Sequence, residues 1–271
     1  MNIVDKITAG ATSISLFSYI TTKLHGRLTD EVYKRNAIIY EPISAVSIVI
    51  PAFNEENYIE RTLKSILSQN IILKHPDYFE CIVVDNESTD RTAEIAKQYC
   101  QVISTPKGKL NARHAGIEHA SGDIIVSCDA DCYYPPNWLN LLLRHFYSPE
   151  VVAVCGPHLQ EGNLLQIIGS VWYNNLFPLA KQRINGANSA FLKEAYYKVG
   201  CFDLSIDQFN REQVVTEEEI VFFNKLTSIG KVIFDLQACC FAPIRGRGKR
   251  FYEEYRPETK YQKEVLQGER F

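Results

Sequence analysis

The sequence lacks several features that would assign it to a common class of protein. Its eight cysteines include no C-x-x-C pair, so a four-cysteine zinc site would lack the usual ligand spacing. No G-x-G-x-x-G follows an apolar run, which disfavours a dinucleotide-binding domain. The formal net charge of -3 gives no indication of a nucleic-acid partner. The chain also contains no internal repeat and no low-complexity segment.

Long apolar runs are missing as well. The uncharged segment 7–22 is too short, and too rich in serine and threonine, to span a bilayer. We expect it to form a helix packed on the protein, with peripheral contact to a membrane as the alternative. No secretory signal peptide is apparent, so we expect a cytoplasmic protein whose cysteines are free thiols in a reducing compartment.

Short apolar runs alternate with helical patterns through the first half of the chain. We expect strands at 46–50, 81–84, 102–103 and 124–127. We expect helices at 54–69, 88–99 and 111–120, the second of them capped at Ser88. This alternation predicts an α/β fold with a mostly parallel central sheet flanked by helices. Ligands of such sheets bind at the carboxyl ends of the strands, where Pro51, Asp85 and Asp129 stand.

The second half of the chain is less regular. We expect helices at 137–147, 164–182 and 217–229, and strands at 151–155, 186–191 and 232–234. These patterns divide the chain into an N-terminal extension (1–44), one domain (45–244) and a basic, aromatic C-terminal tail (245–271).

Two carboxylates, Asp129 and Asp131, stand one residue apart after the apolar run 124–126. Carboxylates at the end of a buried strand can share one hard divalent cation, which can in turn hold the phosphates of a nucleotide. The alternative is that both aspartates only form the turn, as aspartate commonly does.

Seven segments in a fixed order carry a resemblance to a known family. They are V-S-I-V-I-P-A-F-N-E-E (46–56), C-I-V-V-D-N-E-S-T-D (81–90), K-G-K-L-N-A-R-H-A-G-I (107–117), A-S-G-D-I-I-V-S-C-D-A-D (120–131), N-G-A-N-S-A-F (185–191), V-G-C-F-D (199–203) and E-E-E-I (217–220). Together they resemble the family 2 glycosyltransferases, which have a GT-A fold, over residues 45–235. The resemblance implies an inverting transfer of sugar from a nucleotide sugar to an acceptor hydroxyl. Among nucleotide sugars, a UDP-sugar is the donor that we expect. The resemblance also implies Mn²⁺ or Mg²⁺ as cofactor and a carbohydrate, lipid-linked or protein glycan as acceptor.

The resemblance also assigns residues to the donor site. The donor-binding residues are Pro51, Ala52, Phe53, Glu55, Asp85, Lys109, Arg113, Asp129 and Ala130. It places Asp85 at the nucleobase, although a helix cap is the alternative for this residue. It gives Asp131 to the metal and Asp129 to the ribose or the metal. Lys109 and Arg113 lie four residues apart on one helical face, where they can pair with the pyrophosphate or hold the aspartates. No histidine follows His158, so we expect no histidine ligand from the C-terminal part.

The acidic cluster 217–219 is the candidate for the catalytic base. We expect it at a helix start, where the helix dipole favours ionised carboxylates. Counting back from Gly230 selects Glu219 as the base, and counting forward from Thr216 selects Glu218. A charged first turn without a catalytic role is the alternative.

Several aromatic and basic residues have two interpretations. Tyr133, Tyr134, Trp138, Trp172 and Tyr173 can stack on sugar faces or pack in the core. The basic residues of 245–250 can form a lid over the diphosphate, a patch for acidic lipids or a solvated tail.

Two other functions compete with sugar transfer. A sugar-1-phosphate nucleotidyltransferase would carry a glycine-rich signature after the first strand, and none is present. A non-catalytic nucleotide-sugar-binding module would not need both the aspartate pair and the acidic cluster. The chain has no Q-x-x-R-W motif, so we expect a single addition and not processive synthesis.

Overall fold

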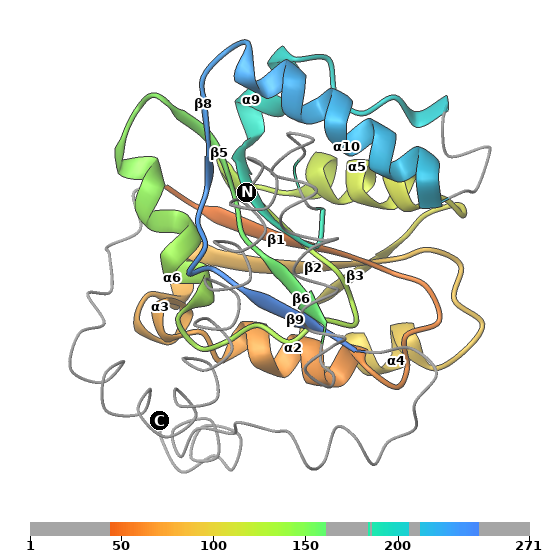
Figure 1. Cartoon of the computed structure of the whole chain (residues 1–271). Helices are drawn as coiled ribbons and strands as arrows, with labels where there is room; N and C mark the ends of the chain where they lie inside the picture. Colours follow the sequence, from red (N-terminus) through yellow and green to blue (C-terminus); the bar gives the residue numbers. More distant parts are fainter. Residues whose placement is uncertain (1–43, 161–183, 185, 206–211, 244–271) are drawn as a thin grey trace, which may run out of the picture.

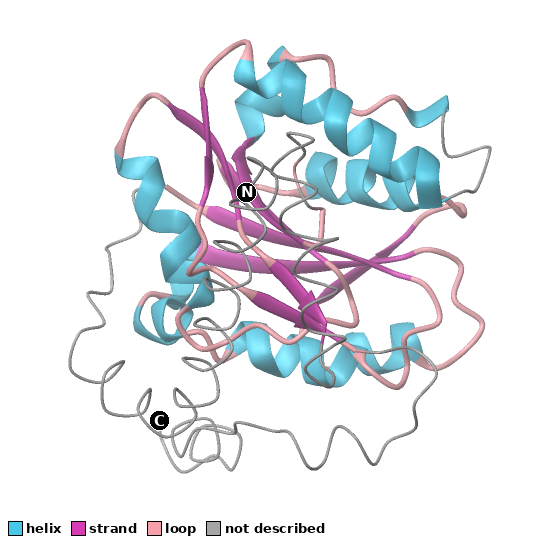
Figure 2. Ribbon diagram, viewed as in Figure 1, coloured by secondary structure: helices cyan, strands magenta, loops and turns pink. Residues whose placement is uncertain are grey.

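A computed structural model describes residues 44–160, 184, 186–205 and 212–243. Figures 1 and 2 show a central sheet with helices on both faces. The sheet has seven strands in the order β3-β2-β1-β4-β7-β5-β8. This is the mostly parallel sheet with flanking helices that the sequence predicted.

Four parallel strands form one half of the sheet. They are β1 (Val46–Ala52), β2 (Phe79–Asp85), β3 (Gln101–Ser104) and β4 (Ile124–Cys128). Because all four run the same way, their carboxyl ends meet at one edge, which we call the carboxyl edge.

One antiparallel strand joins the two halves of the sheet. β7 (Asn188–Leu192) runs antiparallel to β4 and to β5 (Val151–Cys155), and β8 (Lys231–Phe234) is parallel to β5. The register pairs Asn188 with Cys128, so β7 begins at the carboxyl edge. A separate pair of short parallel strands, β6 (His158–Gln160) and β9 (Cys240–Ala242), forms a second sheet.

The helices lie in two layers. They are α2 (Ile59–Leu67), α3 (Asn70–Lys74), η1 (Pro76–Tyr78), α4 (Thr92–Ala96), α5 (Lys109–His119), α6 (Trp138–Leu143), η2 (Arg144–Tyr147), α9 (Lys193–Lys198) and α10 (Glu212–Thr227). Figure 1 shows α2, α3, α4 and α6 on one side of the sheet and α5, α9 and α10 on the other.

The alternation of side chains along β1 explains the two layers. Successive residues of a strand point to opposite faces, so Ile48 and Ile50 pack with Leu63 of α2 while Val49 packs with Ile117 of α5. Both faces are therefore apolar, as the continuous apolar run of β1 predicted.

Helix α5 packs closely on the sheet at Gly116. A Cβ atom built there would lie 2.3 Å from Val49 Cγ1, so no larger residue fits without a shift of the helix. This close contact sets α5 against β1 and β2, with its first turn at the carboxyl edge (Figure 1).

Three local predictions were wrong. The helix expected from Asn54 begins only at Ile59, because Asn54 has a φ of 55° and lies outside helical geometry. Ser88 does not cap α4: its Oγ accepts the N–H of Asn54 at 3.0 Å, while Asp90 Oδ1 accepts the N–H of Thr92 at 2.9 Å. Helix α10 begins at Glu212, so the acidic cluster does not stand in its first turn.

Some expectations fall outside the described residues. They are the extension up to residue 43, the helix at 164–182 with Trp172 and Tyr173, and the tail 245–271. Among the helices that the structure does describe, none has both the length and the hydropathy of a membrane span.

Candidate functional site

The ends of β1 and β2 bring together the first group of expected site residues. Pro51 and Ala52 are buried at the end of β1, and Ala52 pairs in register with Asp85. Phe53 follows and is exposed, with Lys107 Nζ 4.6 Å from the centre of its ring. Glu55 is buried, and its backbone N–H donates to Thr92 Oγ1 at 2.7 Å.

Asp85 offers an unused acceptor at this edge. The residue is 7% exposed, and its Oδ1 has no hydrogen-bond partner among the described residues. The neighbouring Asn86 is fixed on both sides, donating its N–H to Ala52 O and accepting the Gly108 N–H at Oδ1. A buried carboxylate oxygen without a donor is costly, so a ligand N–H is the natural partner for Asp85 Oδ1.

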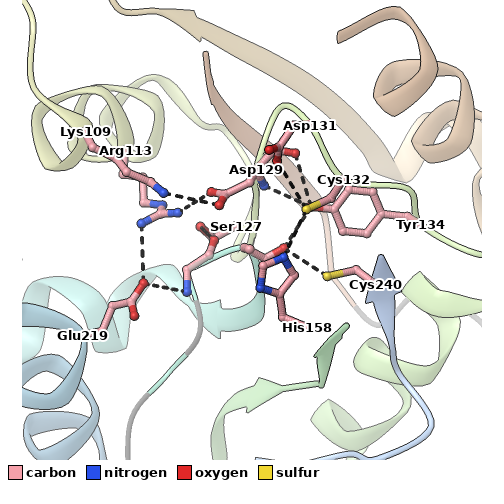
Figure 3. Close-up of polar contacts among 12 residues, drawn as sticks. Lys109, Arg113, Ser127, Asp129, Asp131, Cys132, Tyr134, His158, Glu219 and Cys240 are labelled. Atoms are coloured by element: carbon pink, nitrogen blue, oxygen red, sulfur yellow. Dashed lines mark hydrogen bonds and ion pairs between the residues drawn. The ribbon is translucent and has the colours of Figure 1, made fainter. Parts of the chain in front are cut away.

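Arg113 occupies the centre of the site (Figure 3). It is only 3% exposed, and its Nη2 lies 2.7 Å from Asp129 Oδ1. Lys109, one turn earlier on α5, places Nζ 3.3 Å from Asp129 Oδ2 and is 46% exposed. The two cations of α5 therefore hold Asp129 from one helical face, one of the two roles that their spacing suggested.

These cations determine the charge of Asp129. Burial alone would raise the pKa of the Asp129 carboxyl, which is 22% exposed. The positive charges of Lys109 and Arg113 outweigh burial and hold this pKa well below its usual value. Asp129 is therefore an anion at any physiological pH.

The same guanidinium reaches the acidic cluster of α10. Glu219 Oε1 lies 3.9 Å from Arg113 Nη1 and accepts the backbone N–H of Gly186 at 3.0 Å. A Cβ atom at Gly186 would lie 2.3 Å from Arg113 Nη1, so a larger residue there would displace the guanidinium. Glu219 is 15% exposed, and the side chain of Glu218 lies outside the described part of α10. Arg113 thus supplies the positive charge that we had expected from a helix start.

A buried tyrosine fixes the turn that carries the two aspartates. The Tyr134 hydroxyl accepts the N–H of Asp129 at 3.0 Å and donates to Ala187 O at 2.8 Å. Thr62 Oγ1 donates to the carbonyl of Ala130 at 2.8 Å. Tyr134 and Trp138 are fully buried, with ring centres 4.3 Å apart, so they pack in the core and the sugar-stacking interpretation is wrong for both.

The two aspartates differ in their contacts. Both oxygens of Asp129 face cations of the protein, and the neighbouring Asp131 is half-buried. Asp131 Oδ1 accepts a hydrogen bond from Cys132 Sγ at 3.5 Å. A carboxylate donor set suits Mn²⁺ or Mg²⁺, so the two aspartates fit such an ion chemically.

Sequence reasoning assigned no role to Gly186 or to the Tyr134 hydroxyl. The segment N-G-A-N-S-A-F did contain a signal for Gly186, because a glycine directly before an apolar strand indicates a tight turn. Ser127 Oγ also donates to Gly186 O at 2.6 Å, so this turn is fixed to β4 as well as to α10.

Comparison with known proteins decides the family. The family model described as "Glycosyl transferase family 2" matches residues 47–195, more than half of the chain. The chain belongs to this family. The match agrees with the resemblance carried by the sequence motifs, and it favours a transferase over the nucleotidyltransferase alternative.

Several curated members of family 2 are similar to this chain. The glycosyltransferase AglE of Haloferax volcanii is 36% identical over 196 residues, 69% of this chain and 59% of the relative. A hyaluronan synthase of Streptococcus pyogenes is 30% identical over 200 residues, 66% of this chain and 45% of the relative. An undecaprenyl-phosphate 4-deoxy-4-formamido-L-arabinose transferase of Pseudomonas fluorescens is 35% identical over 155 residues, 54% of this chain and 44% of the relative. The chain thus spans about half the length of these relatives.

Solved structures of transferases share the fold of this family 2 chain. A mannosyltransferase of Pyrobaculum calidifontis, in complex with GDP-Man and Mn²⁺, has a TM-score of 0.58 at 19% identity, over 91% of this chain and 70% of its own. TarS of S. aureus, in complex with UDP-GlcNAc, has a TM-score of 0.56 at 17% identity, over 78% of this chain and 62% of its own. The fold is therefore GT-A, as expected.

Replacing Arg113 by methionine tests the central ion pair. We expect Arg113→Met to lower the free energy of unfolding by roughly 3 kcal/mol, because it leaves the partly buried Asp129 carboxylate without its closest cation. Lys109→Met is the matched control: this pair is half-exposed, so we expect a loss of less than about 1 kcal/mol. Urea unfolding at pH 7 measures both.

The same pair has a defined pH dependence. The pKa of Asp129 is lower in the folded chain than its unfolded value of about 3.9, so its stabilisation is complete above that pH. As the pH falls below about 4, towards the folded-state pKa, the difference between wild type and Arg113→Met should shrink. A difference that stays constant from pH 7 to pH 3 would contradict this assignment.

Proposed function

We propose that this chain transfers a sugar, with inversion, from a nucleoside-diphosphate sugar to an acceptor hydroxyl. A UDP-sugar is the proposed donor, Mn²⁺ or Mg²⁺ the cofactor, and one sugar is added in each encounter. The observation that carries the proposal is the placement of three carboxylates: Asp129 and Glu219 approach Arg113, and Asp85 ends β2 at the same carboxyl edge as Asp129. Two of them share the buried Arg113 guanidinium.

The nucleoside end of the donor is assigned to β1 and β2. Asp85 Oδ1 accepts an N–H of the nucleobase, which supplies the hydrogen bond that this buried oxygen lacks among the described residues. Pro51, Ala52 and Phe53 line the base and ribose, with Glu55 near the ribose. Neighbours of this fold bind donors of two kinds, GDP-Man and UDP-GlcNAc, so the choice of UDP remains part of the proposal.

The diphosphate end is assigned to the turn after β4. Asp131, with Asp129 and the backbone at Ala130 beside it, would hold the divalent ion, which neutralises charge on the departing nucleoside diphosphate. Lys109 is half-exposed and carries its charge next to Asp129, where it can also face a phosphate. Arg113 is too deeply buried for that role and positions the carboxylates instead.

Glu219 is the proposed catalytic base. An inverting transfer needs a group that takes the proton of the acceptor hydroxyl as the bond between sugar and phosphate breaks. Glu219 is oriented by the Gly186 N–H through Oε1 and approaches Nη1 of Arg113, whereas Asp129 contacts Nη2 (Figure 3). Glu218 remains the alternative base.

The acceptor class is proposed from the relatives. Among the carbohydrate, lipid-linked and protein-glycan acceptors, the similarity to an undecaprenyl-phosphate transferase supports a lipid-linked one. The relatives include a hyaluronan synthase as well. The length of the product made from one acceptor therefore tests the proposed single addition.

Asp85→Ala tests the nucleoside site. We expect the affinity for UDP to fall by roughly tenfold, because a charged hydrogen bond contributes about 1.5 kcal/mol. The exposed Asp77→Ala of η1 is the matched control and should bind UDP like wild type. Calorimetric titration gives both constants, and unchanged affinity in a folded Asp85→Ala would remove this residue from the site.

Asp131→Asn tests the metal assignment. The neutral amide is a much poorer ligand for a hard cation, so we expect metal-dependent transfer to be lost. Wild type should lose activity in excess chelator and regain it with Mn²⁺ or Mg²⁺. Full transfer by wild type in chelator would show a metal-independent enzyme.

Glu219→Gln tests the base. Glutamine keeps the shape and can still accept the Gly186 N–H, but it cannot take a proton, so we expect transfer to fall roughly 10²-fold or more. UDP affinity should stay near the wild-type value. Glu218→Gln is the matched control in the same cluster, and steady-state rates at saturating donor compare the two. A dead Glu218→Gln beside an active Glu219→Gln would move the base by one residue.

A further inference from the structure

Three potential soft-metal ligands meet beside the aspartate turn. Cys132 Sγ, a ring nitrogen of His158 and Cys240 Sγ all lie within 4.8 Å of one another. Both cysteines are fully buried and His158 is partly exposed. Figure 3 shows the three side chains pointing toward one another, next to Asp131. None of these three residues has a part in the proposed transfer.

Backbone pairing fixes this arrangement. His158 and Cys240 are register partners in the parallel pair β6 and β9. Tyr133, which follows Cys132, exchanges two backbone hydrogen bonds with Phe241, which follows Cys240, at 2.8 and 2.9 Å. Backbone hydrogen bonds therefore hold together the three segments that carry these side chains, although the segments are far apart in the sequence.

The spacing of the three side chains is compatible with a tetrahedral metal site. Cys132 Sγ lies 3.6 Å from His158 Nε2, and Cys240 Sγ lies within 4.8 Å of Cys132 Sγ and of a ring nitrogen of His158. In a tetrahedron with bonds of about 2.0 Å to N or O and about 2.3 Å to S, the ligand-to-ligand edges are about 3.5–3.8 Å. The cluster can therefore enclose a small ion without a large movement of the chain.

We propose that Cys132, His158 and Cys240 bind one Zn²⁺ ion, with a water molecule at the fourth position. Two sulfurs and one imidazole select Zn²⁺ over the hard cations that carboxylates prefer. Binding replaces the two thiol protons, which pass to solvent, and involves no change of oxidation state. The site is distinct from the Mn²⁺ or Mg²⁺ site of the proposed function, and its test does not depend on sugar transfer.

The site would also have a mechanical effect. Zn²⁺ would tie Cys132, the residue directly after Asp131, to β6 and β9. It would thereby restrict the turn that carries both aspartates. Two other arrangements can produce the same closeness of these side chains. One is a hydrogen bond between the Cys132 thiol and His158, which has about the same length as a tetrahedral edge. The other is a disulfide between the two cysteines, so the experiment must distinguish a bound metal from both.

The experiment uses the full chain, stripped of metal and kept reduced, and titrates it with Co²⁺ and with Zn²⁺. We expect one equivalent of Co²⁺ to give a thiolate-to-cobalt charge-transfer band, which a carboxylate site cannot produce, and one equivalent of Zn²⁺ to remove it. Cys240→Ser and His158→Gln should each weaken binding by at least about tenfold. Cys239→Ser is the matched control, since its sulfur donates to Leu236 O outside the cluster, and it should bind like wild type.

Two results would overturn the proposal. One is a reduced, folded wild-type chain that gives no charge-transfer band at micromolar Co²⁺ and takes up no Zn²⁺. The other is a band of equal strength in wild type and in both ligand variants. Circular dichroism shows whether each variant is folded. If Cys240→Ser does not fold, His158→Gln still provides the test, because His158 is partly exposed and its replacement by glutamine disturbs the core less.

Discussion

The site depends on one buried positive charge. A guanidinium that is almost fully removed from water costs several kcal/mol unless anions and hydrogen-bond acceptors surround it. In this chain Asp129 contacts Arg113 from the turn after β4, and Glu219 approaches it from α10. The need to neutralise Arg113 therefore sets the position of both carboxylates. Gly186 lies against the same guanidinium, and a side chain at this position would displace it.

Much of the fold could be predicted from the sequence, because strands that are buried on both faces appear as continuous apolar runs. Continuous β-branched runs located β1, β2, β4 and β5, and the runs of β2 and β4 led to Asp85 and Asp129 at the carboxyl edge. The spacing of four residues placed Lys109 and Arg113 on one helical face, and the structure shows that both face Asp129 there. The sequence left the choice between Glu218 and Glu219 open, because counting back from Gly230 and counting forward from Thr216 give registers one residue apart. The contact with Gly186 favours Glu219, and it comes from a segment far away in the sequence.

Other features depended on tertiary contacts that no local pattern encodes. Tyr134 and Trp138 had the composition of a sugar platform, yet their polar atoms bond to Ala187 and Asn188 inside the core. The Asn188 side chain also donates to the carbonyls of Pro157 and Ala238, so one amide joins three segments. The cysteine and histidine cluster arises from the pairing of β6 with β9. The sequence offered only scattered cysteines without C-x-x-C spacing, and no rule of spacing could have joined them.

The direction of β7 has a consequence for which groups reach the carboxyl edge. A parallel strand is entered from the edge opposite to the site, whereas the antiparallel β7 is entered at the carboxyl edge itself. The residues that lead into β7, Gly186 and Ala187, are therefore held at that edge, where Gly186 lies against Arg113 and Ala187 O accepts the Tyr134 hydroxyl. A strand of opposite direction thus lets the chain contribute backbone groups to the carboxyl edge on its way into a strand, and not only on its way out of one.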